Sequence, residues 1–114
     1  ARKQINLVVL STVLPGTVRS KLAPLTNEYV SLCYNPLFIG MGTAMRDFLD
    51  PEFVLFGVWD DSAARKAEEL YRTLHSKQFL RTTVENAELI KVAYNTFIGL
   101  KIIFANTLME ICDT

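Results

Sequence analysis

One apolar segment, INLVVLSTVLPG at residues 5–16, determines the fold class. Its apolar and β-branched residues, closed by a Pro-Gly turn, predict a strand over residues 5–13 that is buried on both faces, as in a parallel sheet. Residues 29–34 and 53–59 repeat the pattern. Helical spacing in the segments between these runs then indicates an α/β fold.

Three helices are predicted from apolar spacing and from residues that start or stop helices. Residues 17–26 form the first, which Pro24 limits in length, and residues 42–49 form the second, which an Asp-Pro pair ends. Residues 63–74 carry an amphipathic stripe after a cluster of N-capping residues. His75 falls in the last turn of this helix, where a cation complements the helix dipole, and this surface role is favoured over catalysis.

A polar connection at residues 76–83 leads into one long helix. Thr82 and Glu85 form a capping-box pattern, and no proline follows them. Apolar residues surround this helix, which must therefore be buried on all sides by a further domain or by a second copy of the chain. We expect two parts, an α/β part at residues 1–82 and a helical part at residues 83–114.

The composition excludes several classes of protein. With 114 residues, 12 basic and 12 acidic side chains and a formal net charge of zero, the chain is one globular unit without the basic surface that a nucleic acid or an anionic membrane requires. The most apolar stretch, residues 92–105, is interrupted by polar residues and glycine, whereas a membrane span needs ~18 apolar residues. We expect a soluble protein with no nucleic-acid or membrane partner.

Cysteine and histidine usage indicates a reducing compartment and no metal. Cys33 and Cys112 lie far apart, which gives neither a disulfide framework nor paired metal ligands, and we interpret both as small buried hydrophobic residues. A single histidine leaves a zinc site to be assembled from scattered ligands. A cytoplasmic protein is expected. Because the chain begins with Ala1 and a strand follows almost at once, we also expect a piece of a longer protein.

Three polar residues in the long helix form the first candidate site. Glu88, Lys91 and Asn95 are spaced three and four residues apart and therefore share one helix face. They form either an exposed stripe with a Glu88–Lys91 surface pair, or a functional face that projects into a ligand cleft. In the second case Lys91 stabilises a developing oxyanion and Asn95 orients a polar substrate.

Two further candidates lie at the ends of predicted strands. Ser11 and Thr12 end the first strand, at the edge of an open α/β sheet where ligands bind, unless their hydroxyls only satisfy backbone groups of the turn. Tyr34-Asn35-Pro36 ends the second strand and leads into Gly40-Met41-Gly42. Glycine there either permits the backbone to approach a ligand or belongs to an irregular loop.

Four motifs occur in register over nearly the whole chain. They are Ser11-Thr12-Val13-Leu14-Pro15-Gly16-Thr17, Tyr34-Asn35-Pro36 with Phe38 and Gly42-Thr43-Ala44, Asp47-Phe48 with Pro51 and Gly57, and Ala87-Glu88-Leu89-Ile90-Lys91 with Asn95, Phe97 and Asn106. In order and spacing they resemble the UDP-glucose/GDP-mannose dehydrogenase family.

The resemblance implies an NAD-dependent nucleotide-sugar 6-dehydrogenase, which oxidises the C6 alcohol of a UDP- or GDP-sugar to the uronate through a thiohemiacetal and a thioester on a cysteine. It also implies that residues 1–82 are the C-terminal part of a Rossmann-like NAD-binding domain, with about three strands and their helices. The long helix would then open the central domain through which the family forms homodimers.

Position by position, the resemblance assigns roles to four residues. Thr12 matches the threonine that helps to hold the hydrolytic water near the nicotinamide, and together with Ser11 it implies contact with NAD. Lys91 matches the lysine that stabilises the oxyanion intermediates, and Asn95 matches the asparagine next to the sugar.

The loop after the second strand both matches and departs from the family pattern. Phe38 and Ile39 match positions whose backbone meets the substrate. Leu37 stands where the family has a glutamate that serves as a base during thioester formation and hydrolysis, and Gly40-Met41 replaces a charged pair. Because leucine cannot transfer protons, the second oxidation lacks its usual base.

Two family features match no segment of this chain. It contains no Gly-x-Gly-x-x-Gly, so we expect the pyrophosphate-binding turn upstream of Ala1, and neither Cys33 nor Cys112 matches the nucleophilic cysteine. We therefore expect the isolated chain to be inactive. The alternative is a non-catalytic module whose long helix exists to dimerise. A short-chain or hydroxyacid dehydrogenase is disfavoured because neither Tyr-x-x-x-Lys nor a suitably placed histidine is present.

Overall fold

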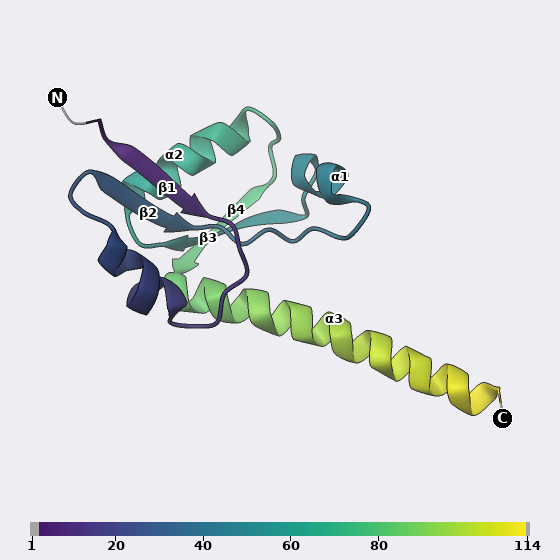
Figure 1. Cartoon of the computed structure of the whole chain (residues 1–114). Helices are drawn as coiled ribbons and strands as arrows, with labels where there is room; N and C mark the ends of the chain where they lie inside the picture. Colours follow the sequence, from purple (N-terminus) through teal and green to yellow (C-terminus); the bar gives the residue numbers. More distant parts are fainter. Residues whose placement is uncertain (1–2, 114) are drawn as a thin grey trace.

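A four-stranded sheet carries helices on both faces, and one long helix extends away from it (Figure 1). The computed structural model describes residues 3–113, so the outermost positions of the two predicted parts, residues 1–2 and 114, lie outside it. In chain order the elements are β1 (Ile5–Val9), the π-helical turn η1 (Val18–Leu22), the 3-10 turn η2 (Ala23–Leu25), β2 (Val30–Tyr34), α1 (Ala44–Leu49), β3 (Phe53–Val58), α2 (Asp61–Arg72), β4 (Gln78–Thr83) and α3 (Val84–Cys112). The predicted α/β class is confirmed.

The strands follow the order β1-β2-β3-β4, and β2 and β3 are antiparallel. β1 pairs with β2 and β3 pairs with β4 in parallel, as expected for this class. The prediction of a parallel sheet is wrong at the β2–β3 junction, because an apolar run predicts a buried strand but not its direction. Asp60 extends that junction, since its backbone amide donates to the Leu32 carbonyl at 2.9 Å and its carboxylate accepts from the Leu32 amide at 2.7 Å.

Two strands differ from their predicted form. β1 ends at Val9 and lies at the edge of the sheet, so Ile5 and Leu7 are exposed and the prediction of a strand buried on both faces is wrong. The predicted polar connection at residues 76–83 is largely β4, which pairs with β3 over its whole length. Its mixed pattern of polar and apolar residues gave no strand signal, because an edge strand has little buried surface to display.

The predicted helices are found near their expected positions, apart from the first. α1 and α2 confirm the helices expected at residues 42–49 and 63–74 within a few residues. Residues 17–26 fold into the two short turns η1 and η2 instead of one helix, because Pro24 lacks the N–H that a continuous α-helix needs.

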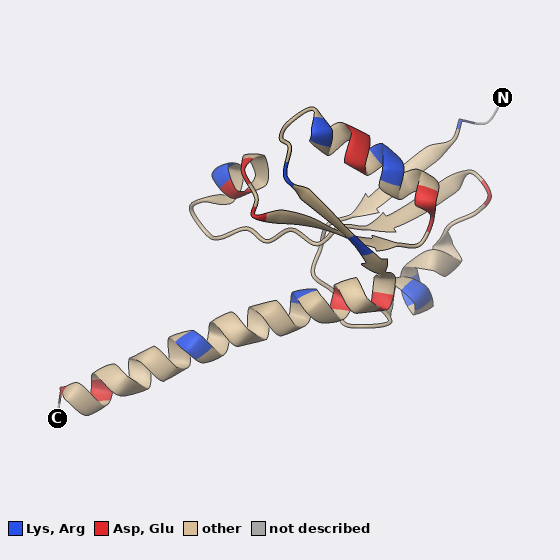
Figure 2. Cartoon of the chain, turned by 180° about the vertical axis from the view of Figure 1, so that it is seen from behind, with Lys and Arg blue, Asp and Glu red and all other residues tan. Residues whose placement is uncertain are grey.

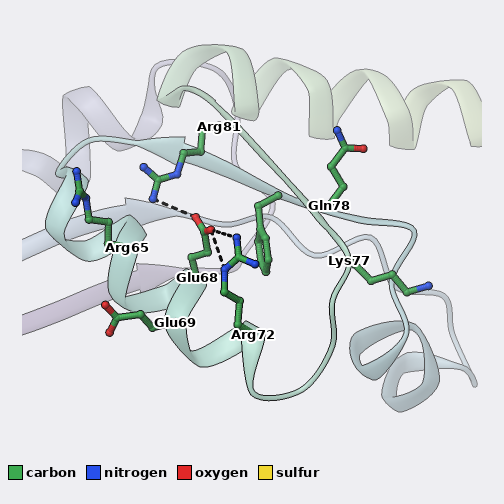
Figure 3. Close-up of a pocket in the computed structure, with 8 residues that line it drawn as sticks. Arg65, Glu68, Glu69, Arg72, Lys77, Gln78 and Arg81 are labelled. Atoms are coloured by element: carbon green, nitrogen blue, oxygen red, sulfur yellow. Dashed lines mark hydrogen bonds and ion pairs between the residues drawn. The ribbon is translucent and has the colours of Figure 1, made fainter.

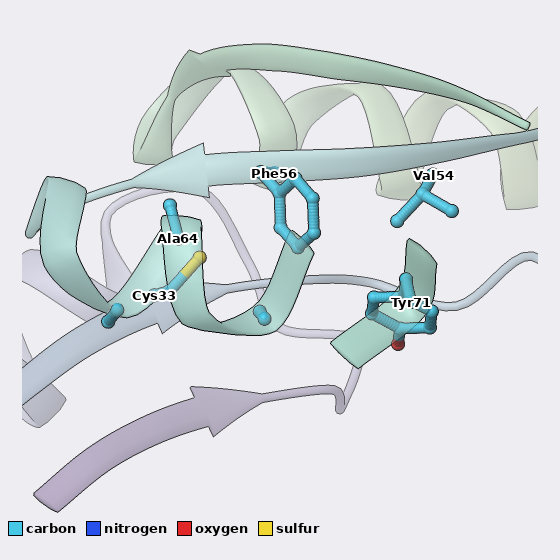
Figure 4. Packing of buried hydrophobic residues seen from close by; sticks show 7 residues of the cluster. Cys33, Val54, Phe56, Ala64 and Tyr71 are labelled. Carbon is cyan, nitrogen blue, oxygen red and sulfur yellow. The ribbon is translucent and has the colours of Figure 1, made fainter. Parts of the chain in front are cut away.

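Side chains from the helices fill a core on each face of the sheet. Between α2 and the sheet, the cluster consists of Cys33, Val54, Phe56, Ala63, Ala64, Ala67 and Tyr71 (Figure 4). The other face packs against η1 and the first turn of α3 through Val18, Leu32, Tyr34, Leu55, Val84 and Ala87. Gly57 permits this second contact, because a Cβ at its position would lie 2.8 Å from the Ala87 Cβ and 3.0 Å from the Val84 Cα.

His75 and Cys112 do not have their expected environments. α2 ends at Arg72, and the His75 ring packs with its centroid 5.8 Å from that of Tyr71 and 6.0 Å from that of Phe79. The prediction of a surface cation in the last helical turn is therefore wrong. Cys33 is buried as expected, and its burial raises the pKa of the thiol to about 12. Cys112 is exposed, like the rest of the distal part of α3, so the expectation of a buried side chain is wrong.

α3 is the long helix that the sequence predicts, but its cap lies one residue later than expected. The Thr83 hydroxyl accepts the Asn86 amide, and Glu85 pairs with Arg19 instead of completing a capping box with Thr82. Only its first turns are buried in the domain. Beyond them α3 projects outward, which gives the chain extents of 70 × 32 × 21 Å (Figure 1).

The projecting part of α3 carries few charges and many exposed apolar side chains (Figure 2). The exposed apolar residues include Phe97, Leu100, Ile102, Ile103, Phe104, Leu108 and Ile111. Within residues 3–113, α3 is one helix that by length and composition alone could cross a membrane, a test that core helices of soluble proteins also pass. Its apolar surface requires cover that residues 3–113 do not provide.

Candidate functional site

A groove of about 600 Å³ lies where α3 leaves the domain. The loop after β2 and the start of α1 form one wall, and α3 forms the other. The lining residues are Phe38, Ile39, Gly40 and Asp47 on the first side and Lys91, Tyr94, Asn95, Ile98, Gly99 and Ile102 on the second. Four residues predicted from sequence to meet the substrate, Phe38, Ile39, Lys91 and Asn95, are thus brought together.

Lys91 is a buried cation without an anionic partner. Its residue is 6% exposed, and within residues 3–113 no carboxylate lies at ion-pair distance from its Nζ. The Nζ lies 4.7 Å from the ring centroid of Phe38 and 5.8 Å from that of Tyr94, so two aromatic rings partly replace its hydration. Burial lowers the pKa of Lys91 from its ordinary value.

Glu88 and Asn95 differ sharply in burial although they share a helix face with Lys91. Asn95 is exposed in the groove, whereas Glu88 is fully buried. The Glu88 carboxylate accepts the backbone amides of Gly16 at 2.6 Å and Val18 at 2.8 Å. The alternative of an exposed stripe with a Glu88–Lys91 surface pair is therefore wrong for both charged residues.

Ser11 and Thr12 lie outside this groove. They follow β1 in an exposed segment, and within residues 3–113 neither side-chain hydroxyl has a hydrogen-bond partner. The adjacent Val13 packs against the same hydrophobic cluster as Phe38, which connects this segment to the groove wall. The alternative that these hydroxyls satisfy backbone groups of the turn is not supported, and they remain free to meet a ligand at the carboxyl end of β1.

Buried hydrogen bonds fix the start of the loop that follows β2. The Asn35 side chain donates to the Leu55 carbonyl at 2.9 Å and accepts the Tyr71 hydroxyl at 2.6 Å. Leu37 then lines a separate small cavity of about 20 Å³ together with Phe48, and it is absent from the lining of the groove.

Asp47 holds the glycine-containing part of the loop in place. One of its carboxylate oxygens accepts the Gly40 amide at 2.9 Å and the Thr43 hydroxyl at 2.5 Å. The Thr43 hydroxyl, followed by the Gly40 amide, lowers the pKa of Asp47. A left-handed φ of +82° at Gly42 completes the turn into α1. The loop is therefore an ordered wall of the groove.

Sequence reasoning assigned no role to two of the lining residues, Asp47 and Tyr94. Asp47 stands in a recognised motif, but its carboxylate partners depend on how the loop folds back. Tyr94 lies three residues after Lys91, and its ring packs edge to face with Phe38 at 4.9 Å. Its position on the Lys91 face was the available signal.

A second cleft, of about 560 Å³, lies between α2 and β4 and is lined by charged side chains (Figure 3). Every cation in it has a carboxylate partner: Arg65 pairs with Asp61, Arg72 with Glu68, Lys77 with Asp50, and Arg81 with both Asp61 and Glu68. Each of these cations is thus held in an ion pair, so none is left unpaired for an anionic ligand. Within residues 3–113, no group of three or more His, Cys, Asp or Glu side chains is placed to hold a metal ion.

Comparisons of sequence and of structure with known proteins point to one family. The model of the UDP-glucose/GDP-mannose dehydrogenase family, NAD binding domain, matches residues 1–75. UDP-glucose 6-dehydrogenase of Rickettsia conorii is 33% identical over 113 residues, which is 97% of this chain and 26% of that protein. GDP-mannose 6-dehydrogenase of Pseudomonas aeruginosa is 35% identical over 114 residues, covering 93% of this chain and 26% of that protein.

The fold comparison extends this similarity. The crystal structure of a ternary complex of GDP-mannose dehydrogenase from Pseudomonas aeruginosa superposes with a TM-score of 0.83 at 34% identity, over 92% of this chain and 26% of that one. The chain therefore spans about a quarter of the length of the relatives that it matches.

Proposed function

The chain belongs to the UDP-glucose/GDP-mannose dehydrogenase family, and on this premise we propose that it forms part of an NAD-dependent nucleotide-sugar 6-dehydrogenase. The full-length enzyme oxidises the C6 alcohol of a UDP- or GDP-sugar to the uronate. The resemblance found in the four sequence motifs is confirmed, as are the Rossmann-like fold class and NAD as the cofactor of the family. The sheet has four strands where about three were expected.

One observation carries the proposal: a buried, unpaired Lys91 faces a groove beside Asn95 and the loop that carries Phe38 and Ile39. An ammonium group in a site with little water stabilises negative charge on an oxygen much better than it would in solution. We assign to Lys91 the stabilisation of the oxyanion that develops on the sugar oxygen. Asn95 orients a polar group of the sugar, and Phe38 and Ile39 contact the substrate from the opposite wall.

The residues that fit NAD are Ser11 and Thr12. They present free hydroxyls at the carboxyl end of β1, where ligands of open α/β sheets bind. When bound, NAD would supply the hydride acceptor for the oxidation of the sugar. We assign to both residues contact with the cofactor, and to Thr12 also the holding of the hydrolytic water. The chain has no Gly-x-Gly-x-x-Gly turn for the pyrophosphate, so it supplies only part of the cofactor site.

We further propose that residues 1–82 end the NAD-binding domain and that residues 83–114 open a central helical domain. Two copies of the protein associate through α3, whose exposed apolar side chains support this assignment. The balanced charge supports the absence of a nucleic-acid partner, and the charged residues Lys101 and Glu110 within α3 favour a protein interface over a membrane span. A cytoplasmic location agrees with these properties.

The second candidate is a non-catalytic dimerisation module, which the exposed surface of α3 and the apolar Leu37 favour. One experiment separates the two. The full-length protein is incubated with NAD and either UDP-glucose or GDP-mannose, and NADH and uronate formation are followed. Turnover with one of these sugars supports the dehydrogenase. A folded, dimeric protein that forms no NADH with either sugar would overturn it in favour of the module.

A further inference from the structure

The Glu88 carboxylate is fully buried and has no cation beside it. Both of its oxygens are used, since Oε2 accepts the amide of Gly16 at 2.6 Å and Oε1 accepts the amide of Val18 at 2.8 Å. Within residues 3–113, no Lys, Arg or His lies at ion-pair distance from it. Burying a carboxylate is costly unless hydrogen bonds replace its water. The two backbone amides supply these bonds, so the buried position of Glu88 depends on them.

The two amides belong to a turn that is also held by its own hydrogen bonds and by packing. Gly16 has a left-handed φ of +87°, and its carbonyl accepts both the amide and the hydroxyl of Ser20. Val18 is fully buried in the cluster that includes Leu32 and Val84. Glu88 therefore holds a rigid point of the chain.

That rigid point fixes one end of the segment that carries Ser11 and Thr12. The other end is fixed where the Val9 carbonyl accepts the Asn35 amide at 2.8 Å. Between these points, residues 10–15 are mostly exposed, apart from Val13, which packs against the cluster that includes Tyr34. Near the Gly16 turn, the Thr17 amide donates to the Leu14 carbonyl. The position of Ser11 and Thr12 therefore depends on how firmly Glu88 holds the turn.

Glu88 also lies on the helix that carries the groove residues. Lys91 follows it by three positions, which is ~4.5 Å along a helix axis, and Asn95 lies one further turn along the same face. One carboxylate thus connects the segment proposed to meet NAD with the helix proposed to meet the sugar. It does so across the boundary proposed between residues 82 and 83.

We propose that Glu88 is a positioning residue, which holds the Ser11–Thr12 segment in register with Lys91. The inference rests on the proposed function, since it gives Glu88 a role in aligning cofactor and substrate. Rates of such reactions depend steeply on alignment, and a displacement of ~1 Å can cost about 100-fold. A Glu88 that served only to stabilise η1 would affect the stability of the protein but not the turnover of its folded fraction.

The test uses Glu88→Gln in the full-length protein. The glutamine has nearly the same shape, but its amide N–H meets one of the two backbone N–H groups, so one hydrogen bond is lost. The matched control is Glu85→Gln, one turn earlier on α3, which removes the exposed partner of Arg19. Assays run well below the melting temperature of each variant, so that all molecules are folded.

Two readouts are measured. The first is kcat and KM with the sugar nucleotide that the wild-type protein uses. We expect Glu88→Gln to lower kcat by at least about tenfold with little change in the KM of the sugar nucleotide, and Glu85→Gln to leave both unchanged. The second is amide hydrogen exchange without NAD or sugar. We expect faster exchange of the Gly16 and Val18 amides, which Glu88 accepts, in Glu88→Gln only.

The outcomes separate this inference from the proposed function. A wild-type protein without dehydrogenase activity contradicts the proposed function, while hydrogen exchange still tests the link between Glu88 and the segment. An active wild type, with a folded Glu88→Gln variant of unchanged kcat and unchanged exchange, overturns the positioning role alone. If Glu88→Gln does not fold, Glu88→Asp takes its place. It keeps the charge but is one methylene shorter, and wild-type kcat in that variant overturns the proposal.

Discussion

Replacing Lys91 with alanine tests the candidate site most directly. The change removes a buried ammonium group whose Nζ lies 4.7 Å from the Phe38 ring, and it leaves the groove wall formed by Phe38 and Ile39 in place. The carboxylate bonds of Glu88 to Gly16 and Val18 do not involve Lys91 and should persist. The variant therefore subtracts one charge from the site while the surrounding backbone contacts stay intact.

The expected magnitude follows from the burial of the charge. A preorganised donor to a developing oxyanion contributes ~3 kcal/mol or more, and about 1.4 kcal/mol corresponds to tenfold in rate. Lys91→Ala should therefore lower kcat by about 100-fold or more. The KM for NAD should stay nearly constant, because an interaction specific to the transition state does not contribute to ground-state binding.

The assay follows NADH formation by the full-length enzyme with saturating NAD and sugar nucleotide. Lys101→Ala is the matched control, because Lys101 lies on the same helix, is exposed, and has its Nζ 5.6 Å from the Phe97 ring. The control should keep wild-type kcat. A loss of less than about threefold in Lys91→Ala would refute the assignment, since so small a change is typical of a surface charge.

The same assay has a pH dependence with a defined sign. Burial lowers the pKa of Lys91 below its ordinary value of 10.5, so the ammonium form is lost in the folded enzyme at lower pH than in free lysine. Activity that needs the ammonium should fall as pH rises through this lowered pKa, and Lys91→Ala should lack that alkaline limb. Between the lowered pKa of Lys91 in the folded enzyme and its ordinary value in the unfolded chain, the unfolded chain binds more protons. The free energy of unfolding therefore rises with pH in this range, because the cost of burying the charge disappears.

Three further outcomes are expected. The 114-residue chain alone should give no saturable heat with millimolar NAD in calorimetry, because it has no Gly-x-Gly-x-x-Gly turn, and a micromolar Kd would contradict this. The same chain should self-associate at micromolar concentration in sedimentation experiments, because Phe97, Ile102 and Phe104 are exposed on α3, whereas a clean monomer would argue against an interface there. Leu37→Glu should lower the free energy of unfolding in urea by ~1–3 kcal/mol and should not speed uronate formation, because Leu37 lines a cavity too small for a hydrated carboxylate. Unchanged stability with faster uronate formation would place position 37 in the active site.

The sequence predicted the elements of the fold better than their arrangement. Apolar runs and helical spacing located β2, β3, α1, α2 and α3, because burial leaves a periodic trace. The direction of β3 relative to β2 left no such trace, since both directions bury the same side chains. β4 was missed because its pairing with β3, and not its own composition, makes it a strand.

In the site, too, features that depend on nearby residues were predicted, and features that depend on distant residues were not. Lys91, Asn95 and Phe38 were predicted, because helical spacing and a resemblance in order place them on one face and one loop. The environment of Glu88 could not be predicted, because its partners Gly16 and Val18 lie 72 and 70 residues away. The spacing also did not predict that Glu88 and Lys91 are buried while Asn95 is exposed, because all three share a helical face.

The short antiparallel junction of the sheet has a consequence for cooperativity in folding. Within residues 3–113, the ladder there pairs Cys33 with Val58 and Tyr34 with Gly57, and Asp60 adds hydrogen bonds to Leu32, so the two parallel strand pairs are joined through a short junction. Side chains hold the halves together instead: Tyr71 of α2 lies in one cluster with Cys33 and Phe56, and Val84 of α3 in another with Leu32 and Leu55. A cavity in either cluster should therefore let the β1–β2 and β3–β4 pairs open separately. Unfolding would then no longer be two-state, even though few atoms had been removed.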